Sequence, residues 1–210
     1  MLLLCFLLFP PSGRAQFIAA RSGSTIRLHG FADGIHGPWQ VQGKVIQGKL
    51  DVGPNFPVQP DQAVTPGPVV AAADVYIPVT SLKNPDLSPF ATAGWESMLH
   101  EKLKPQEQRR IHFHLTELVL KAVPNYKDGP YLFGSKGDLA VAGVTNKLTM
   151  AVQVLPLADG KLKISGATEV KMSDFKIEPP VLVAPLKTHD RVSLSFDWMV
   201  QKRANAHEER

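Results

Sequence analysis

Cysteine is nearly missing from this sequence: Cys5 is the only one among 210 residues. It lies in an apolar segment at the start of the chain, which we interpret below as a leader. Without that segment the chain has no thiol, which excludes a disulfide scaffold, a cysteine nucleophile and a cysteine-based zinc site. The folded protein must therefore be stabilised by its core alone.

A concentration of charge is missing as well. The formal net charge is +4, and the nearest approach to a basic cluster is the pair Arg109 and Arg110. A nucleic-acid interface needs a wider basic patch, so we predict no nucleic-acid partner. The 44% of hydrophobic and 20% of charged residues are typical of a folded globular protein and exclude disorder throughout.

Catalytic and metal-binding patterns are also missing. Neither Gly-x-Ser-x-Gly nor His-Glu-x-x-His occurs, and no nucleophile and base stand at a recognisable spacing. His112 and His114 would share one face of a strand, but a metal site needs further ligands that the spacing does not supply. We interpret Ser173 and Asp174 as a turn in which the aspartate bonds to backbone amides. The sequence therefore predicts no catalytic residue, no metal and no enzyme activity.

No hydrophobic run in the sequence is long enough for a membrane-spanning helix. Residues 2–9 form an eight-residue apolar run, which is too short to cross a bilayer. Pro10, Pro11 and an approach of small residues to Ala15 follow it, in the pattern of a secretory signal that lacks the usual basic start. We predict that residues 1–15 are a signal peptide and that the protein is periplasmic or secreted. Residues 16–201 are expected to form one domain, and residues 202–210 a polar tail.

Most of the remaining chain alternates apolar and polar residues with a period of two. The alternating runs begin near Ile26, Val41 (continuing to Val45), Val75, Ile111, Leu148, Leu162 and Val192. This alternation is typical of antiparallel strands that have one buried face and one solvent-exposed face. Turn residues separate the runs at 127–130, 143–146 and 158–160.

Two segments interrupt this pattern. Residues 94–108 predict a helix, because Trp95, Met98, Leu99 and Leu103 recur at helical spacing before Pro105. Residues 53–68 contain five prolines and predict a long surface loop, which could also cover a barrel mouth.

About eight strands with one buried face must close on themselves or pair with a second sheet, since an open sheet leaves unpaired edges. A closed barrel of this size is either filled by side chains or holds one small ligand. The alternation alone does not separate a barrel from a sandwich. We predict an all-β domain of about eight antiparallel strands with one interrupting helix.

Several segments, taken together, resemble the YceI-like family. They are STIRLHGFADGIHGPWQVQGKVIQGKL (24–50), VYIPVTSLKN (75–84), the predicted helix followed by RRIHFHLTEL (109–118), GDLAVAGVTNKLTMAVQV (137–154), GATEVKMSDFKIEPP (166–180) and DRVSLSFDWMVQ (190–201). The hairpin motif Gly143-Val144-Thr145 is the most specific of these features. Lys176 departs from the family pattern, in which glycine often stands at that place.

The resemblance implies a lipocalin-like antiparallel β-barrel that is exported and is not catalytic. Some members of the family hold a polyprenyl quinone or a polyprenyl phosphate inside the barrel. The implied partner is thus an apolar lipid, and no cofactor is expected other than a bound polyisoprenoid lipid or quinone. The oligomeric state stays open, with a homodimer among the alternatives.

The inward faces of the predicted strands are the candidate lining of a ligand cavity. The side chains are Phe113, Leu115, Leu148, Met150, Val152, Ile164, Leu194, Phe196 and Trp198. A long apolar ligand needs a dry and largely preformed sleeve, in which each buried methylene contributes about 0.8 kcal/mol. The other interpretation is that the same side chains fill the barrel and leave no room.

The sequence therefore predicts an exported lipid-binding protein that sequesters or carries a polyisoprenoid-type chain. In this mechanism the chain enters the barrel, its hydration water is released, and its head group stays near the mouth. The alternative is a non-catalytic structural or interaction protein with a packed barrel and a protein partner.

Overall fold

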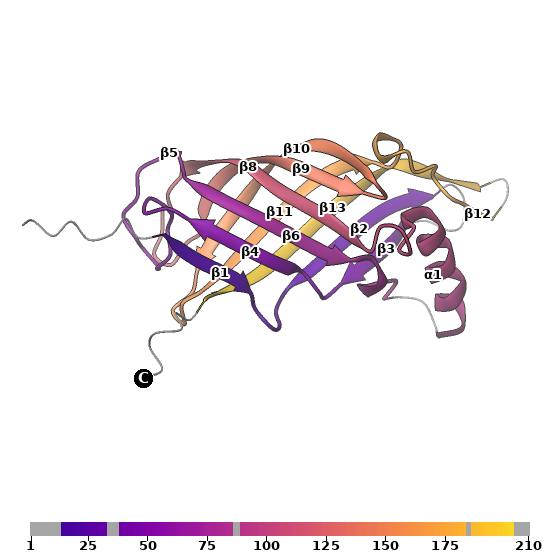
Figure 1. The fold of residues 1–210 in the computed structure, drawn as a ribbon, viewed down its shortest axis with the longest axis horizontal. Helices are drawn as coiled ribbons and strands as arrows, with labels where there is room; N and C mark the ends of the chain where they lie inside the picture. Colours follow the sequence, from indigo (N-terminus) through magenta and orange to yellow (C-terminus); the bar gives the residue numbers. More distant parts are fainter. Residues whose placement is uncertain (1–13, 33–37, 86–88, 184–185, 204–210) are drawn as a thin grey trace, which may run out of the picture.

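The computed structural model describes residues 14–32, 38–85, 89–183 and 186–203. Eight antiparallel strands form a closed ring (Figure 1). In ring order they are β1 (Ala15–Ala19), β4 (Gln47–Val52), β6 (Ala71–Pro78), β8 (Arg110–Ala122), β9 (Tyr131–Val141), β10 (Val144–Pro156), β11 (Lys161–Lys171) and β13 (Leu186–Lys202). Pairing of β1 with β13 closes the ring, so the predicted barrel is confirmed and a sandwich is excluded. Most of the predicted signal peptide and polar tail lies outside the described residues.

The long strand β13 pairs with two different strands along one edge. Its final part pairs with β1, and its central part pairs with β2 (Thr25–Ala32). The sheet continues from β2 through β3 (Pro38–Gly43) to β7 (Leu82–Lys83), which follows the short helix η2 (Val79–Ser81). Two small strands complete the fold: β5 (Gly67–Pro68) pairs with β8, and β12 (Val181–Val183) pairs with β13.

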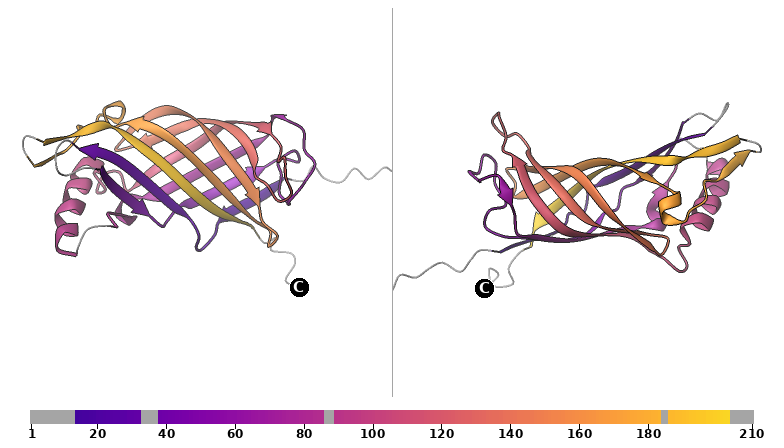
Figure 2. Two further views of the ribbon diagram at one scale, coloured as in Figure 1. Left: turned by 180° about the vertical axis from the view of Figure 1, so that it is seen from behind. Right: turned by 90° about the horizontal axis from the view of Figure 1, so that it is seen from above.

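The α-helix α1 (Pro89–Leu103) stands at one end of the barrel, and β5 lies at the other end (Figures 1 and 2). It begins five residues before the predicted start, because Pro89 occupies the first turn, where a missing N–H costs nothing. It ends as predicted before Pro105, with Lys104 in the left-handed conformation (φ 48°). No helix in the described parts of the chain has the length and apolarity needed to cross a membrane.

The hairpin between β9 and β10 turns earlier than the sequence predicts. The two turn residues are Ala142 (φ 50°) and Gly143 (φ 84°), and Val144 already pairs with Val141. Two residues with positive φ are typical of a type I′ turn, whose twist matches that of the flanking strands. The predicted turn at 143–146 is therefore wrong, because residues 144–146 begin β10.

Replacing Ala142 with glycine is expected to stabilise the protein by about 0.5–1 kcal/mol, because alanine is strained at positive φ and glycine is not. Urea unfolding of both proteins measures the change. Gly143→Ala is the opposite control and should destabilise. A lower midpoint for Ala142→Gly would contradict this account of the turn.

The alternation predicted through Val41 and Val45 breaks between β3 and β4. Val45 is 39% exposed, while the next residue, Ile46, is buried. The chain leaves one strand at Gly43 and starts another at Gln47, so the inward phase shifts by one residue. The predicted inward position of Val45 is therefore wrong.

The proline-rich segment 53–68 closes the end of the barrel that lies opposite α1. Phe56 is 1% exposed, and its ring stacks on that of Phe133 with centroids 5.5 Å apart. The Tyr131 hydroxyl donates a hydrogen bond of 2.6 Å to the Gln62 carbonyl. The prediction of a surface loop is thus only partly right. We call the fully buried side chains at this end the barrel floor: Phe56, Tyr131, Phe133, Leu162 and Val200.

Candidate functional site

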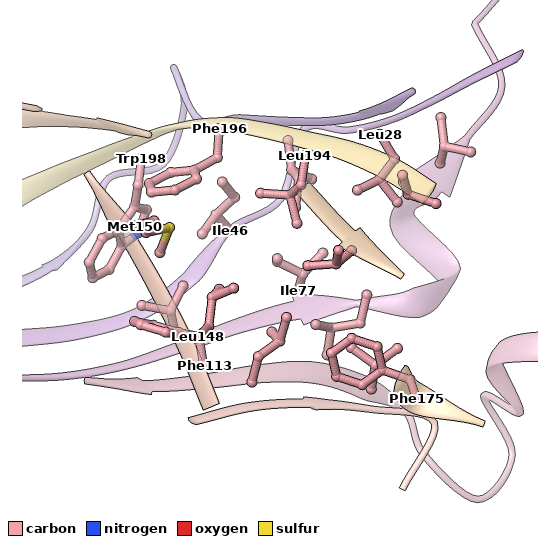
Figure 3. Close-up of a pocket in the computed structure, with 18 of the residues that line it drawn as sticks. Leu28, Ile46, Ile77, Phe113, Leu148, Met150, Phe175, Leu194, Phe196 and Trp198 are labelled. Carbon is pink, nitrogen blue, oxygen red and sulfur yellow. The ribbon is translucent and has the colours of Figure 1, made fainter. Parts of the chain in front are cut away.

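An apolar cavity of about 240 Å³ occupies the barrel, and its lining reaches from Phe56 of the floor to Leu99 of α1. Figure 3 shows part of this lining. All nine side chains predicted from the alternation line it: Phe113, Leu115, Leu148, Met150, Val152, Ile164, Leu194, Phe196 and Trp198. They come from β8, β10, β11 and β13. The structure therefore brings the whole predicted set together around one space.

Other lining residues lie outside the predicted set, and three of them come from the irregular parts of the fold. Ile46 enters from the connection between β3 and β4, Leu99 from α1, and Phe175 from the short helix η3 (Ser173–Phe175). Strand positions Leu28 and Ile77 also line the cavity (Figure 3). The apolar–polar alternation already predicts that Leu28 and Ile77 face inward. It could not identify Ile46, Leu99 and Phe175, because these residues lie outside the alternating strands.

The lumen stays open because its large rings lie over glycines of neighbouring strands. The pairs are Phe113 over Gly137, Phe196 over Gly166 and Trp39 over Gly30. A Cβ atom at any of these glycines would come between 2.1 and 2.8 Å from the ring above it, which is closer than atoms can approach. Each ring thus occupies the place of a missing side chain and lies along the barrel wall. This arrangement keeps aromatic volume out of the barrel axis.

The cavity reaches the surface at the α1 end, which we call the mouth. Lys171 is exposed and yet lines the cavity, and Lys102 of α1 lines it as well. Two hydroxyls also line the cavity, but both use their protons within the protein. Ser135 donates to the Met150 carbonyl (3.0 Å), and Thr188 donates to the Pro180 carbonyl (2.8 Å). The mouth therefore offers cationic side chains to a ligand, whereas the interior of the cavity offers almost no polar groups.

A hydrogen-bonded carboxylate holds η3 at the mouth. The Ser173 backbone N–H and hydroxyl both donate to Asp190 of β13, at 2.8 and 2.6 Å. These hydrogen bonds lower the pKa of Asp190. The structure thus gives Asp190 the role that the sequence analysis assigned to Asp174. Through this contact β13 fixes the position of Phe175 in the cavity wall.

The two histidines of β8 share one face of the strand, as predicted; this is the outer face, where both lie near one carboxylate. His114 Nδ1 lies 2.9 Å and His112 Nε2 3.3 Å from the same oxygen of Asp74 on β6. The ring of Tyr76 stacks on that of His112 at 4.5 Å. Within the described ranges, no group of three or more histidine, cysteine, aspartate or glutamate side chains could hold a metal ion.

Replacing Asp74 with asparagine is expected to lower stability slightly near neutral pH, and the difference from wild type should vanish in acid. The hydrogen bond from His114 lowers the pKa of Asp74 below its ordinary value of 3.8. Its contribution is therefore complete above 3.8 and is lost as the pH falls through the lower folded value. The effect is small because the carboxylate is partly exposed. Urea midpoints between about pH 2 and about pH 7 measure it, and a pH-independent difference would contradict it.

Comparison with known proteins supports the same architecture. The model of the YceI-like domain family matches residues 21–200. A search of curated protein sequences gives no significant match.

Two solved structures share the fold at low sequence identity. BcnA from Burkholderia cenocepacia is 15% identical, with a TM-score of 0.61, over 84% of this chain and 95% of BcnA. A polyisoprenoid-binding domain from Saccharophagus degradans is 13% identical, with a TM-score of 0.62, over 91% of this chain and all (100%) of that domain. The match of the family model over most of the chain, together with the eight-stranded barrel, shows that this protein belongs to the YceI-like domain family.

Proposed function

We propose that this protein binds one long apolar chain of the polyisoprenoid type inside its barrel, and so sequesters or carries it. The observation that carries the proposal is the arrangement of Phe113, Phe196 and Trp39 over glycines, which leaves an apolar lumen along the barrel axis. A packed structural barrel would need those rings to point across the lumen. The name of the Saccharophagus degradans domain, which describes polyisoprenoid binding, supports the same ligand class.

The dimensions and chemistry of the cavity favour a slender ligand. Its volume of about 240 Å³ lies below the range of about 300–1,000 Å³ that is common for small-molecule pockets. A single linear chain suits this space better than a fused ring system. Each buried methylene contributes about 0.8 kcal/mol, so several isoprene units need no charged contact to stay bound. Lys102 and Lys171 place positive charge where the head group of such a chain was expected, at the mouth.

The proposed role is binding without catalysis. Of the described residues that line the cavity, only Lys102 and Lys171 carry titratable side chains, and both are at the mouth. Hydrolysis or acyl transfer would need a nucleophile and a base within hydrogen-bonding reach of each other. The interior supplies van der Waals contacts instead.

We also propose that the protein is exported to the periplasm or secreted. The apolar run at residues 2–9 and the small residues before Ala15 support this location. A carrier in such a compartment would hold an apolar chain away from water between membranes.

Native mass spectrometry of the protein purified from its own cells, followed by organic extraction, tests the proposed function. We expect an added mass of several hundred daltons that extracts as an isoprenoid. Protein stripped of lipid should regain that mass when it is incubated with a polyprenyl lipid. A bare protein mass that does not change after this incubation would contradict the proposal and favour a packed barrel with a protein partner.

A further inference from the structure

The open lumen ends within one step of the strands at its inner end. Along the inward face of β13, Phe196 is partly exposed, whereas Trp198 is 3% and Val200 0% exposed. The residues of β11 that pair with the latter two show the same step, since Ile164 is 8% and Leu162 0% exposed. Trp198 and Ile164 still line the cavity, but the pair below them does not. The level of Trp198 is therefore the inner limit of the lumen.

The indole of Trp198 differs from the three lining rings that lie over glycines along the wall. Its partner on β11 is Ile164, and no described glycine has an atom of Trp198 among the nearest neighbours of its Cβ position. The wall beside Trp198 thus already contains a side chain, so the indole projects from the wall into the barrel. Figure 3 shows it at the far end of the lining from Phe175, beside Met150.

The barrel floor supports the indole on the side away from the lumen. Val200 of the floor follows Trp198 on the same face of β13, and the five floor side chains are at most 1% exposed. Interiors packed in this way yield little to a ligand that presses against them. The inner end of the lumen is therefore a fixed surface, whereas the other end is open at Lys171.

We infer that Trp198 sets the length of the chain that the barrel accepts, because the tail of the chain abuts the indole while the head group lies at the mouth. This inference rests on the proposed function, since it concerns a chain bound in the barrel. From Ile164, at the level of the indole, to Lys171 the lumen follows β11 for about 23 Å. At a strand tilt of about 40° this is about 18 Å along the barrel axis. Isoprene units beyond that length stay in water and gain no burial.

The test measures the affinity for all-trans polyprenols that lengthen by one isoprene unit at a time, from geraniol upward. For wild type each added unit should tighten binding about tenfold until the tail reaches the indole, and further units should have little effect. Trp198→Ala removes roughly the volume of one isoprene unit at the end of the lumen, so this limit should move to a chain one unit longer. Competition against a fluorescent polyprenyl analogue gives the affinities.

Phe196→Ala is the matched control. Phe196 lies on the same face of the same strand, two residues nearer the mouth, but its ring lies along the wall over Gly166. Its removal widens the lumen at the side and leaves the inner end in place. The affinity for every chain that reaches this level should fall, while the length limit should stay that of wild type.

A second measurement does not depend on the folding of a Trp198 variant. Isotope-filtered NMR of the wild-type protein, loaded with the polyprenol at the length limit, detects which side chains the tail contacts. We expect the terminal methyl groups of the chain to contact the indole protons of Trp198.

The outcomes separate this inference from the function on which it rests. An affinity that rises with every added unit, a limit that Trp198→Ala leaves unchanged, or a limit that Phe196→Ala moves equally would overturn the inference and leave the binding function intact. Terminal methyl groups that do not contact the indole would do the same. If no polyprenol binds to wild type, the proposed function fails, and the inference fails with it.

Discussion

Met150→Arg is expected to weaken the binding of a polyprenyl lipid by at least about a hundredfold. Met150 points from β10 into the cavity, among side chains that offer no counter-charge. A guanidinium placed there must either lose its hydration or draw water into the lumen, and each costs several kcal/mol. In either case the apolar chain loses the volume that it occupies or the water-free surroundings that stabilise it. Retention of lipid after gel filtration, followed by mass spectrometry, measures the loss.

The neighbouring residue provides a matched control. Thr149 lies on the same strand, and its side chain is exposed on the outer face. Thr149→Arg adds the same group without touching the cavity and should leave lipid binding unchanged. Met150→Trp fills the lumen without adding charge, and it serves as a second test if the arginine variant fails to fold. A folded Met150→Arg protein that keeps its lipid would show that the ligand lies elsewhere.

Phe133→Ala is expected to destabilise the protein by about 3–5 kcal/mol. Phe133 is 0% exposed and stacks on Phe56 in the barrel floor, so its removal leaves a void that rigid strands on both sides cannot close. Urea unfolding monitored by tryptophan fluorescence measures the change in free energy of unfolding. The adjacent variant Leu132→Ala is the control, because Leu132 is 39% exposed, and it should change stability by no more than about 0.5 kcal/mol.

The stacking between Phe133 and Phe56 leads to a second expected result. Because the two rings are in contact, the costs of Phe133→Ala and Phe56→Ala should not add in the double variant. A loss below about 1 kcal/mol for Phe133→Ala would contradict the view that the floor is a tightly packed closure. The proline-rich segment would then be a surface loop, as the sequence first indicated.

The side of the sheet on which each residue lies was readable from the sequence alone. Residues 192–200 alternate so regularly that Leu194, Phe196 and Trp198 had to share a face, because successive side chains of a strand point to opposite sides. This local rule is independent of which strands become neighbours. All nine side chains that it pointed inward line the cavity, and it failed at Val45, where one strand ends and the next begins.

Whether the barrel is hollow was decided by contacts between strands. The alternation allowed both a filled and an open lumen, and a barrel and a sandwich bury the same faces. Closure required β1 to pair with β13, and openness required Phe196 to meet Gly166 on the neighbouring strand. The same holds for Asp74, which is 38 residues before His112 in the chain and meets it only because β6 and β8 are paired. Such contacts join residues that are far apart in sequence, so they depend on strand order and register, which only the folded barrel determines.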